Sequence, residues 1–213
     1  MKIKIGITQR VEKVESYNET RDSLDNRLVN WVSNNNYFPI PIPNNLVDIN
    51  LSNTSQPNLE KWLEDVGIDA LLLSGGNNIG DVLHRDLTER YLLFWAQKYE
   101  KPLLGICRGM QMMGVFAGSN LIKIEGHTNT RHKLKTKNFF NNELPLSVNS
   151  FHDFALVDCP KGYEVLAESE DGSIEAIKHK TLNWEGWMWH PERELPFNDI
   201  DRIRFQMILN NAK

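Results

Sequence analysis

The feature that most constrains the fold is an alternation of buried-strand and helix patterns in the first half of the chain. One continuous apolar run, from Asp69 to Leu73, ends in a glycine turn, and a second, from Leu103 to Ile106, leads directly into Cys107. Runs of this kind are typical of strands buried on both faces of a parallel sheet. Because parallel strands are joined by right-handed crossovers, the sequence predicts an α/β fold with a mainly parallel central sheet flanked by helices. The functional cleft is then expected at the carboxyl ends of the strands.

Other segments extend this prediction. Alternating isoleucines up to Thr8 indicate an opening strand, and the proline-punctuated run from Phe38 to Pro43 indicates an edge strand or an extended connection. The second half favours a small antiparallel element, a hairpin of residues 163–167 and 174–178 around the turn at 170–173. A last strand is expected at 187–189, ending at His190. We expect helices around 24–32 and 88–95, and a terminal helix capped by Asn198 or Asp199 that buries Ile200, Ile203, Met207 and Ile208.

Composition narrows the classes of function. An apolar fraction of 40% is enough for a core, and no linker or repeat divides the chain, so residues 1–213 are expected to form one domain. A net charge of −4 disfavours a nucleic-acid partner, and no apolar run approaches the roughly 20 residues that cross a bilayer. We therefore expect a soluble cytoplasmic protein with no membrane partner. Its two cysteines, Cys107 and Cys159, are too few for a disulfide scaffold.

Cys107 carries the strongest chemical signal. Gly105-Ile-Cys107-Arg-Gly109 lies between an apolar strand and a helix, which is the thiol analogue of the G-x-S-x-G nucleophile elbow. The glycines permit a tight turn, and a helix amino terminus favours thiolate over thiol. A buried structural cysteine is the alternative, and the flanking glycines argue against it. Cys159 lacks both an elbow and a nearby base, so we expect it to be inert.

A thiolate nucleophile needs a proton-transfer partner and donors for the oxyanion. His190 follows the strand-like run Gly186 to Trp189, and Glu192 is placed to orient its imidazole. The backbone N–H groups of Gly76 and Arg108 are candidates for the oxyanion hole, because both follow strand ends. These residues predict acyl transfer through a Cys-His-Glu triad.

No metal site or cofactor is predicted. His127 and His132 are too far apart to share one helix face, and no acidic or thiol ligand stands near them at zinc spacing. They are expected to be solvated or substrate-facing loop residues. The methionines at 110, 112 and 113 are expected to pack in the core behind the nucleophile.

Four blocks of sequence together resemble a known family: Leu-Leu-Ser-Gly-Gly-Asn, Gly105-Ile-Cys-Arg-Gly-Met-Gln111, Val148-Asn-Ser-Phe-His152 and Trp189-His-Pro-Glu192. They resemble the flavodoxin-like class I glutamine amidotransferase fold. Arg85-Asp-x-x-Glu89, V-N-S-x-H and E-A-I-K-H resemble, within it, the γ-glutamyl-γ-aminobutyrate hydrolase branch of peptidase family C26. The chain is shorter than that branch and lacks its proline- and tyrosine-bearing insertion after Gly76, so its leaving-group pocket is expected to differ.

The resemblance implies roles for individual residues. It implies Cys107 as nucleophile, His190 as base, Glu192 as its orienter, and Gly76 and Arg108 as the oxyanion hole. It also implies that a set of residues contacts the substrate: Gly75, Gln111, Asn149, Ser150, Phe151 and His152. We further expect three residues to contact the leaving group, with Arg131 suited to a phosphate: His127, Arg131 and His132.

The expected activity is therefore hydrolysis of a γ-glutamyl amide bond, releasing glutamate and an amine or amidate. The short length, the opening GITQR and N-S-F-H-D-F most resemble hydrolases that act on γ-glutamyl-CDP-amidate in capsule phosphoramidate synthesis. Three alternatives stay open: a γ-glutamyl-GABA hydrolase, a glutaminase subunit that delivers ammonia to a synthase, and a regulatory binding protein of the same fold. We expect no obligate synthase partner, and a homodimer is compatible with the sequence.

Overall fold

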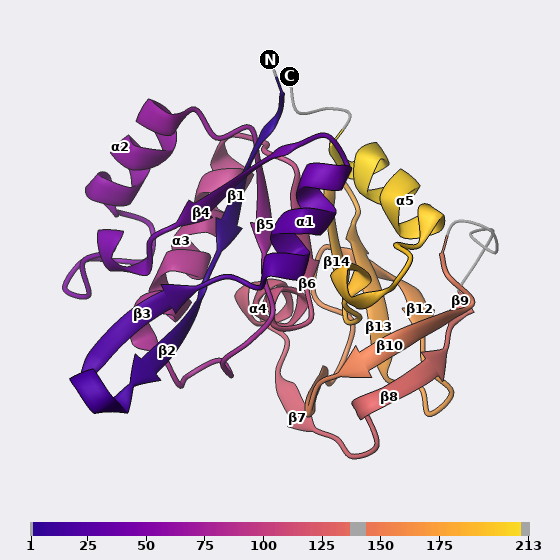
Figure 1. Ribbon diagram of the computed structural model, residues 1–213. Coiled ribbons are helices and arrows are strands. Elements are labelled where there is room, and N and C mark those ends of the chain that lie inside the picture. Colours follow the sequence, from indigo (N-terminus) through magenta and orange to yellow (C-terminus); the bar gives the residue numbers. More distant parts are fainter. Residues whose placement is uncertain (1, 137–143, 210–213) are drawn as a thin grey trace.

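The computed structural model describes residues 2–136 and 144–209 of the 213-residue chain, and its centre is an eight-stranded mixed sheet (Figure 1). The strand order is β4-β1-β5-β6-β14-β13-β12-β9. The five strands from β4 to β14 pair in parallel, and β13, β12 and β9 follow in antiparallel pairing. The bounds are Lys4–Thr8 (β1), Phe38–Ile42 (β4), Ala70–Leu73 (β5), Leu103–Ile106 (β6), Lys135–Thr136 (β9), Tyr163–Glu168 (β12), Ile174–His179 (β13) and Trp184–Trp187 (β14). The predicted parallel sheet, edge strand and antiparallel hairpin are confirmed.

Helices cover both faces of the sheet, as Figure 1 shows. One face is covered by α1 (Asn26–Asn34) and α5 (Asp199–Leu209), whose apolar residues pack in one buried cluster with β1, β6 and β14. The opposite face carries α2 (Pro57–Val66), α3 (Leu83–Lys98) and α4 (Arg108–Phe116), which share a second cluster. The fold is therefore a three-layer α/β arrangement, in agreement with the sequence.

The side chains of the central strand β5, a continuous apolar run, pack against the helix layers on both faces of the sheet. Ala70 and Leu72 point into the cluster of α1 and α5, whereas Leu71 and Leu73 point into the cluster of α2, α3 and α4. All four side chains are fully buried. Burying one leucine contributes about 1.5–3 kcal/mol, so β5 stabilises the packing of both helix layers on the sheet.

Among the described residues, three two-stranded sheets lie outside the main sheet, and they were not predicted from the sequence. They pair β2 (Arg10–Val14) with β3 (Glu19–Ser23), β7 (Leu121–Lys123) with β11 (Phe154–Leu156), and β8 (Thr128–Lys133) with β10 (Ser147–Phe151). Three short 3₁₀ turns complete the described elements: Glu15–Tyr17 (η1), Asn44–Leu46 (η2) and Pro191–Arg193 (η3). The strands of β2 and β3 carry mostly polar side chains, which explains why hydrophobic periodicity does not reveal them.

The terminal helix departs from the prediction. Its cap is Asn198, whose Oδ1 accepts a hydrogen bond from the backbone N–H of Ile200 at 2.8 Å. The predicted face is buried only in part: Ile208 is 5% exposed, but Ile203 and Met207 are 58% and 55% exposed. Beside the apolar Phe205, Ile208 and Leu209, the helix buries two polar residues with partners in the sheet layer. Arg204 donates to Glu185 at 2.7 Å, and Asp201 accepts from Trp189 at 3.2 Å. A pattern of apolar residues cannot predict a face that is partly ionic.

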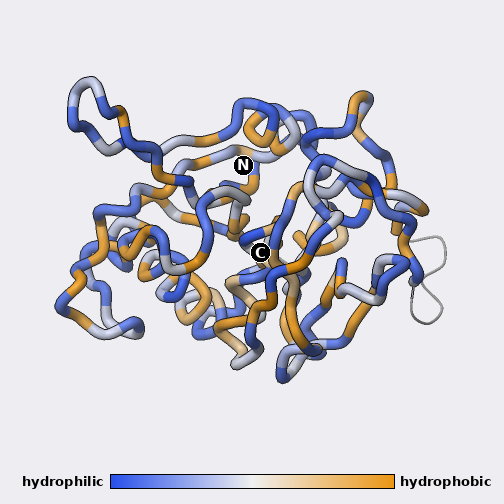
Figure 2. Tube along the Cα trace, turned by 90° about the horizontal axis from the view of Figure 1, so that it is seen from below, coloured by the Kyte–Doolittle hydropathy of each residue, from blue (hydrophilic) through white to orange (hydrophobic). Residues whose placement is uncertain are grey.

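Hydrophobic segments alternate with hydrophilic ones along the whole trace (Figure 2). Within residues 2–136 and 144–209, no helix is long and apolar enough to cross a membrane.

Candidate active site

Cys107 lies at the turn between β6 and α4, in a strained conformation. Its φ of 51° and ψ of −107° are unusual for a residue with a side chain, and its N–H donates to the Trp187 carbonyl at 2.7 Å. Strain of this kind costs of order 1–3 kcal/mol and persists only where surrounding structure enforces it. The elbow predicted from the sequence is therefore present, with Cys107 at the amino terminus of a helix.

Both flanking glycines are required by close packing. A Cβ at Gly105 would lie 2.7 Å from the backbone carbon of Gly109, and a Cβ at Gly109 would overlap the carbonyl oxygen of Leu73. The helix α4 consequently packs directly on the ends of β5 and β6. The methionines at 110, 112 and 113 are fully buried behind the elbow, as expected.

His190 and Glu192 lie beside the thiol. His190 Nδ1 is 2.7 Å from Glu192 Oε1, and both side chains are about 4% exposed. Burial alone would raise the pKa of Cys107, but the hydrogen bond and positive charge of His190 outweigh it and lower that pKa. Burial opposes protonation of His190, but Glu192 and the Cys107 sulfur raise its pKa to about 9. The geometry favours a thiolate–imidazolium pair near neutral pH.

The loop after β5 lies against this pair. A Cβ at Gly75 would come within 2.7 Å of His190 Cε1 and 3.7 Å of the Cys107 Cβ, and Gly76 has a φ of 101° that favours glycine. The backbone N–H of Arg108 also interacts with the Cys107 sulfur and contributes to its lowered pKa. Both proposed oxyanion donors therefore belong to segments that adjoin the nucleophile.

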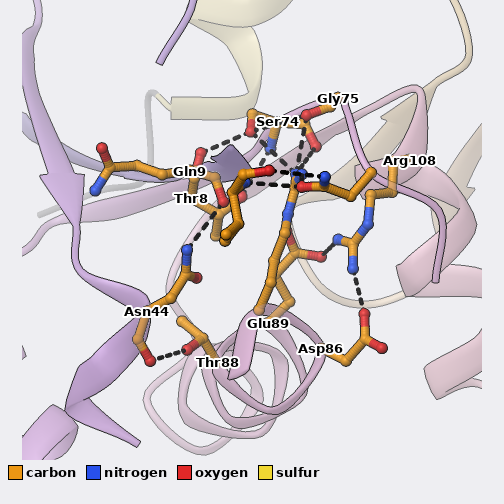
Figure 3. Close-up of polar contacts among 12 residues, drawn as sticks. Thr8, Gln9, Asn44, Ser74, Gly75, Asp86, Thr88, Glu89 and Arg108 are labelled. Carbon is orange, nitrogen blue, oxygen red and sulfur yellow. Dashed lines mark hydrogen bonds and ion pairs between the residues drawn. The ribbon is translucent and has the colours of Figure 1, made fainter. Parts of the chain in front are cut away.

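A buried ionic network holds the Gly75 loop from behind. Arg85 Nη2 donates to the carbonyl oxygens of Ser74 and Gly75, each at 2.9 Å, and its Nε donates to Glu89 at 3.1 Å. Ser74 is fixed in turn by Thr8, whose hydroxyl accepts the Ser74 N–H at 2.9 Å (Figure 3). The Arg85-Asp-x-x-Glu89 motif thus supports the loop and does not line the cavity.

The same network reaches the residue after the nucleophile. The Arg108 guanidinium donates to Glu89 and, at 2.5 Å, to Asp86, as Figure 3 shows. Arg85, Arg108 and Glu89 are at most 2% exposed. Two arginines and two carboxylates therefore join the two segments that carry the proposed oxyanion donors.

The cavity at the carboxyl ends of β1, β5, β6 and β14 has a volume of about 130 Å³. The predicted residues among its lining are Gly75, Gly76, Cys107, Phe151, His190 and Glu192. Sequence reasoning missed the others: Arg10, Ser23, Leu24, Asp25, Leu28, Ser74 and Arg193. Arg193 follows the His-Pro-Glu block directly, so its position was a usable signal. Arg10 begins the unpredicted hairpin of β2 and β3, and Asp25 is the N-cap of α1.

Several predicted substrate residues have their polar atoms engaged by the protein. Asn149 bonds to the backbone N–H and carbonyl of His190, at 2.9 Å and 2.8 Å. Gln111 Nε2 donates to the Phe154 carbonyl at 2.9 Å, and Ser150 Oγ donates to the His127 carbonyl at 2.6 Å. Phe151 meets the His190 ring edge-on at 5.8 Å. The end of β10 and the following His152 therefore pack near the base, and Phe151 is the residue of this segment at the cavity wall.

The three expected leaving-group residues separate in space. Arg131 lies in a groove next to the Cys107 cavity, and Arg193 and Phe151 line both. His127 and His132 lie elsewhere, in a cluster with His152 and Glu175 whose ligand atoms are within 4.8 Å of one another. The prediction that no acidic ligand accompanies these histidines considered only residues close in sequence, and the fold brings Glu175 to them from β13.

Comparisons with known proteins identify similar sequences. The peptidase C26 family model matches residues 4–192. The γ-glutamyl-CDP-amidate hydrolase of Campylobacter jejuni is 36% identical over 209 residues, which cover 94% of this chain and 95% of that protein. A subunit of the glutamine-hydrolysing GMP synthase of Methanocaldococcus jannaschii is 29% identical over 152 residues, covering 68% of this chain and 77% of that one.

Solved structures show the same fold. A GMP synthase subunit from Thermoplasma acidophilum superposes with a TM-score of 0.71 at 21% identity, over 100% of this chain and 94% of that one. A glutamine amidotransferase from Thermotoga maritima gives 0.64 at 16% identity, over 100% and 91%. The class I glutamine amidotransferase architecture expected from the sequence is therefore confirmed.

Proposed function

The chain belongs to the peptidase C26 family, and on that premise we propose that it hydrolyses a γ-glutamyl amide bond through Cys107, His190 and Glu192. One observation carries this proposal: a cysteine in a strained elbow, with a lowered pKa, lies beside a buried His–Glu pair and opens into a cavity. A protein that only binds ligands has no use for a base and its orienting carboxylate, so an enzyme is favoured over a regulatory binding protein.

The acylation step follows from these positions. The Cys107 thiolate attacks the γ-carbonyl carbon, and the backbone N–H groups of Gly76 and Arg108 stabilise the developing oxyanion. The carbon–nitrogen bond breaks as His190 gives its proton to the departing nitrogen. Glutamate is then held as a thioester on Cys107, and the amine or amidate leaves.

Deacylation uses the same groups in reverse. Neutral His190 takes a proton from water, the hydroxide attacks the thioester carbon, and the Cys107 thiolate departs. Glu192 holds the imidazole through Nδ1, so that Nε2 is the nitrogen that faces the reaction. The products are free glutamate and a regenerated thiolate–imidazolium pair.

For the substrate, we propose the γ-glutamyl conjugate of a nucleotide amidate, such as γ-glutamyl-CDP-amidate, in the synthesis of a phosphoramidate-modified surface polysaccharide. The nucleotide amidate is then the leaving group. The substrate named for the Campylobacter jejuni relative supports this choice. Four arginines also line the site, Arg10 and Arg193 in the cavity and Arg27 and Arg131 in the adjoining groove. Arg27 pairs with Asp25 at 2.9 Å and Arg131 with Glu194 at 2.8 Å, so a diphosphate would compete with these carboxylates for the two arginines. Arginines at such a mouth suit a diphosphate.

The test measures glutamate release by the purified chain from equal concentrations of γ-glutamyl-CDP-amidate, γ-glutamyl-GABA and glutamine. We expect kcat/KM for the nucleotide amidate to exceed that for glutamine by at least about a hundredfold, since one or two charged contacts supply roughly 3 kcal/mol. A preference for γ-glutamyl-GABA would reject the nucleotide only.

The same assay separates the glutaminase alternative, which the GMP synthase relatives make relevant. If glutamine were the best substrate, or if all three substrates were inert until a synthase was added, the stand-alone hydrolase would be rejected. An Arg131→Gln variant tests whether Arg131 contacts the phosphates of the leaving group. It should raise KM for the nucleotide amidate substrate and leave glutamine hydrolysis unchanged.

A further inference from the structure

Three histidines and one glutamate meet beneath the β8–β10 pair, apart from the residues that line the Cys107 cavity. His127 directly precedes β8, His132 lies on β8, His152 directly follows β10, and Glu175 lies on β13 of the main sheet. One ligand atom from each lies within 4.8 Å of the others. Segments far apart in the sequence therefore deliver four potential metal ligands to one point.

The hydrogen bonds of two histidines fix which nitrogen faces this point. His127 Nε2 is 2.8 Å from the Asp171 carboxylate, and His152 Nδ1 donates to the Phe154 carbonyl at 3.0 Å. In the neutral imidazole the opposite nitrogen then carries a lone pair. These are Nδ1 of His127 and Nε2 of His152, and both are buried without a hydrogen-bond partner among the described residues. A carboxylate or carbonyl behind each imidazole is the arrangement that orients metal-binding histidines.

Glu175 supplies negative charge at the same point. Its side chain is fully buried, and neither carboxylate oxygen has a hydrogen-bond partner within residues 2–136 and 144–209. Oε1 lies 3.5 Å from His127 Nδ1 and 3.6 Å from His152 Nε2, too far for good hydrogen bonds. A buried carboxylate in this state is unfavourable unless a cation accompanies it. His132 Nε2 is also buried without a hydrogen-bond partner there.

We propose that His127, His132, His152 and Glu175 bind one divalent transition-metal ion, with zinc the best match. Three imidazole nitrogens and one carboxylate oxygen are a suitable four-coordinate donor set for zinc. With metal–ligand distances of about 2.0–2.1 Å, tetrahedral ligand atoms lie roughly 3.3 Å apart. The 3.5 Å and 3.6 Å separations at Glu175 are already close to this value. The other ligand atoms lie up to 4.8 Å apart, so binding draws them together by up to about 1.5 Å.

The position of the proposed ion indicates a structural role. All four coordination positions are filled by protein, and the ion joins the β8–β10 pair to β13 of the main sheet. The β10 strand carries Asn149 and Phe151, which contact His190. The metal therefore stabilises the wall that holds the catalytic base, and the chemical steps at Cys107 do not pass through it.

The competing occupant of this space is a proton, since a protonated His152 can pair with Glu175 without any metal. To distinguish a bound metal ion from a proton, the whole wild-type chain is treated with a chelator to remove metal and is then titrated with Zn²⁺ or Co²⁺. We expect one equivalent to bind, the unfolding midpoint to rise, and the Co²⁺ form to show the visible absorption of a four-coordinate site. A folded stripped protein that takes up neither ion in a 1:1 ratio would overturn the metal site.

Variants locate the ion without relying on activity. Glu175→Gln and the partly exposed His132→Gln should each lower Zn²⁺ affinity by at least about a hundredfold, and Asp171→Asn by about 10–100-fold. His84→Gln, a histidine outside the cluster, is the matched control and should bind zinc as wild type does. One equivalent of zinc bound with unchanged affinity by both Glu175→Gln and His132→Gln would place the ion elsewhere and reject the proposal.

Discussion

The side chain of Asn149 holds both backbone polar groups of His190: its Oδ1 accepts the His190 N–H at 2.9 Å, and its Nδ2 donates to the His190 carbonyl at 2.8 Å. The sequence predicted Asn149 as a substrate contact. Its described bonds support a positioning role for the base, and it also lines the groove beside the cavity.

Replacing Asn149 by alanine should lower kcat by about 10–100-fold and leave KM within about threefold, because a small displacement of a catalytic group is enough for such a loss. Unfolding should become easier by about 1–3 kcal/mol, since two buried backbone groups lose their partner. Steady-state kinetics and thermal unfolding measure both. A raised KM with an unchanged kcat would instead identify Asn149 as a substrate contact.

The pH dependence of turnover should reveal the thiolate–imidazolium pair. The pKa of Cys107 is lowered, so the thiolate is formed as pH rises through a value below that of an ordinary cysteine. The pKa of His190 is raised to about 9, so the imidazolium and the activity are lost as pH rises through that value. We expect rapid alkylation of Cys107 by iodoacetamide at pH 7 and an alkaline limb of kcat/KM near pH 9.

Glu192→Gln tests the origin of that limb. The Glu192 carboxylate raises the pKa of His190 against the effect of burial, so its removal should move the alkaline limb to lower pH. The loss of activity should be smaller than in His190→Ala, because Glu192 orients the imidazole and His190 transfers the proton. An unmoved alkaline limb in Glu192→Gln would show that His190 does not set it.

The buried network should be needed for stability as well as for turnover. Glu89→Gln leaves Arg85 and Arg108 without their shared carboxylate, and breaking a buried ionic network in this way costs about 3–5 kcal/mol. The surface pair of Lys61 and Asp65 is the control, and Asp65→Asn should leave the unfolding midpoint unchanged. Equal effects of the two variants in urea unfolding would show that the network contributes no more than a surface pair.

Asp201 should make stability depend on pH in the opposite direction to an ordinary ion-paired carboxylate. Burial raises its pKa to about 7 despite the hydrogen bond from Trp189, so the folded state binds a proton that the unfolded state releases near pH 4. The resulting stability is present below pH 4 and is lost as pH rises to 7.

Asp201→Asn therefore should stabilise the protein by about 1–3 kcal/mol at pH 8, and the gain should shrink towards pH 5. Denaturant unfolding of both proteins across this range measures it. A destabilised Asp201→Asn protein at pH 8 would mean that the charged form is the one the fold favours.

The elements with strong apolar patterns were predictable, and so was the elbow. Residues 69–73 and 103–106 contribute buried parallel strands, because a continuous apolar run is stable where both faces of the strand are covered by helices. Gly105 and Gly109 were correctly expected to flank a tight turn. The elbow depends on residues that are adjacent in the sequence, so it can be predicted from the sequence alone.

What escaped prediction depends on contacts between distant residues. The β2–β3 hairpin is polar, so no hydrophobic period marks it, yet it brings Arg10 to the cavity. The buried face of α5 combines apolar residues with the Arg204–Glu185 ion pair, whose partner lies in β14. Glu175 joins His127 only because β13 passes beneath β8, and no spacing rule along the chain relates the two.

The activity of Cys107→Ala is the most direct test of the central claim, that this thiolate performs the hydrolysis. The variant should fold as the wild type does, with unchanged circular dichroism, because neighbouring backbone and glycines hold the elbow. Glutamate release from γ-glutamyl-CDP-amidate should fall by a factor of about 10⁴ or more, since alanine at position 107 cannot form the acyl-enzyme. A folded Cys107→Ala protein that still releases glutamate at a tenth of the wild-type rate, or roughly so, would contradict the account.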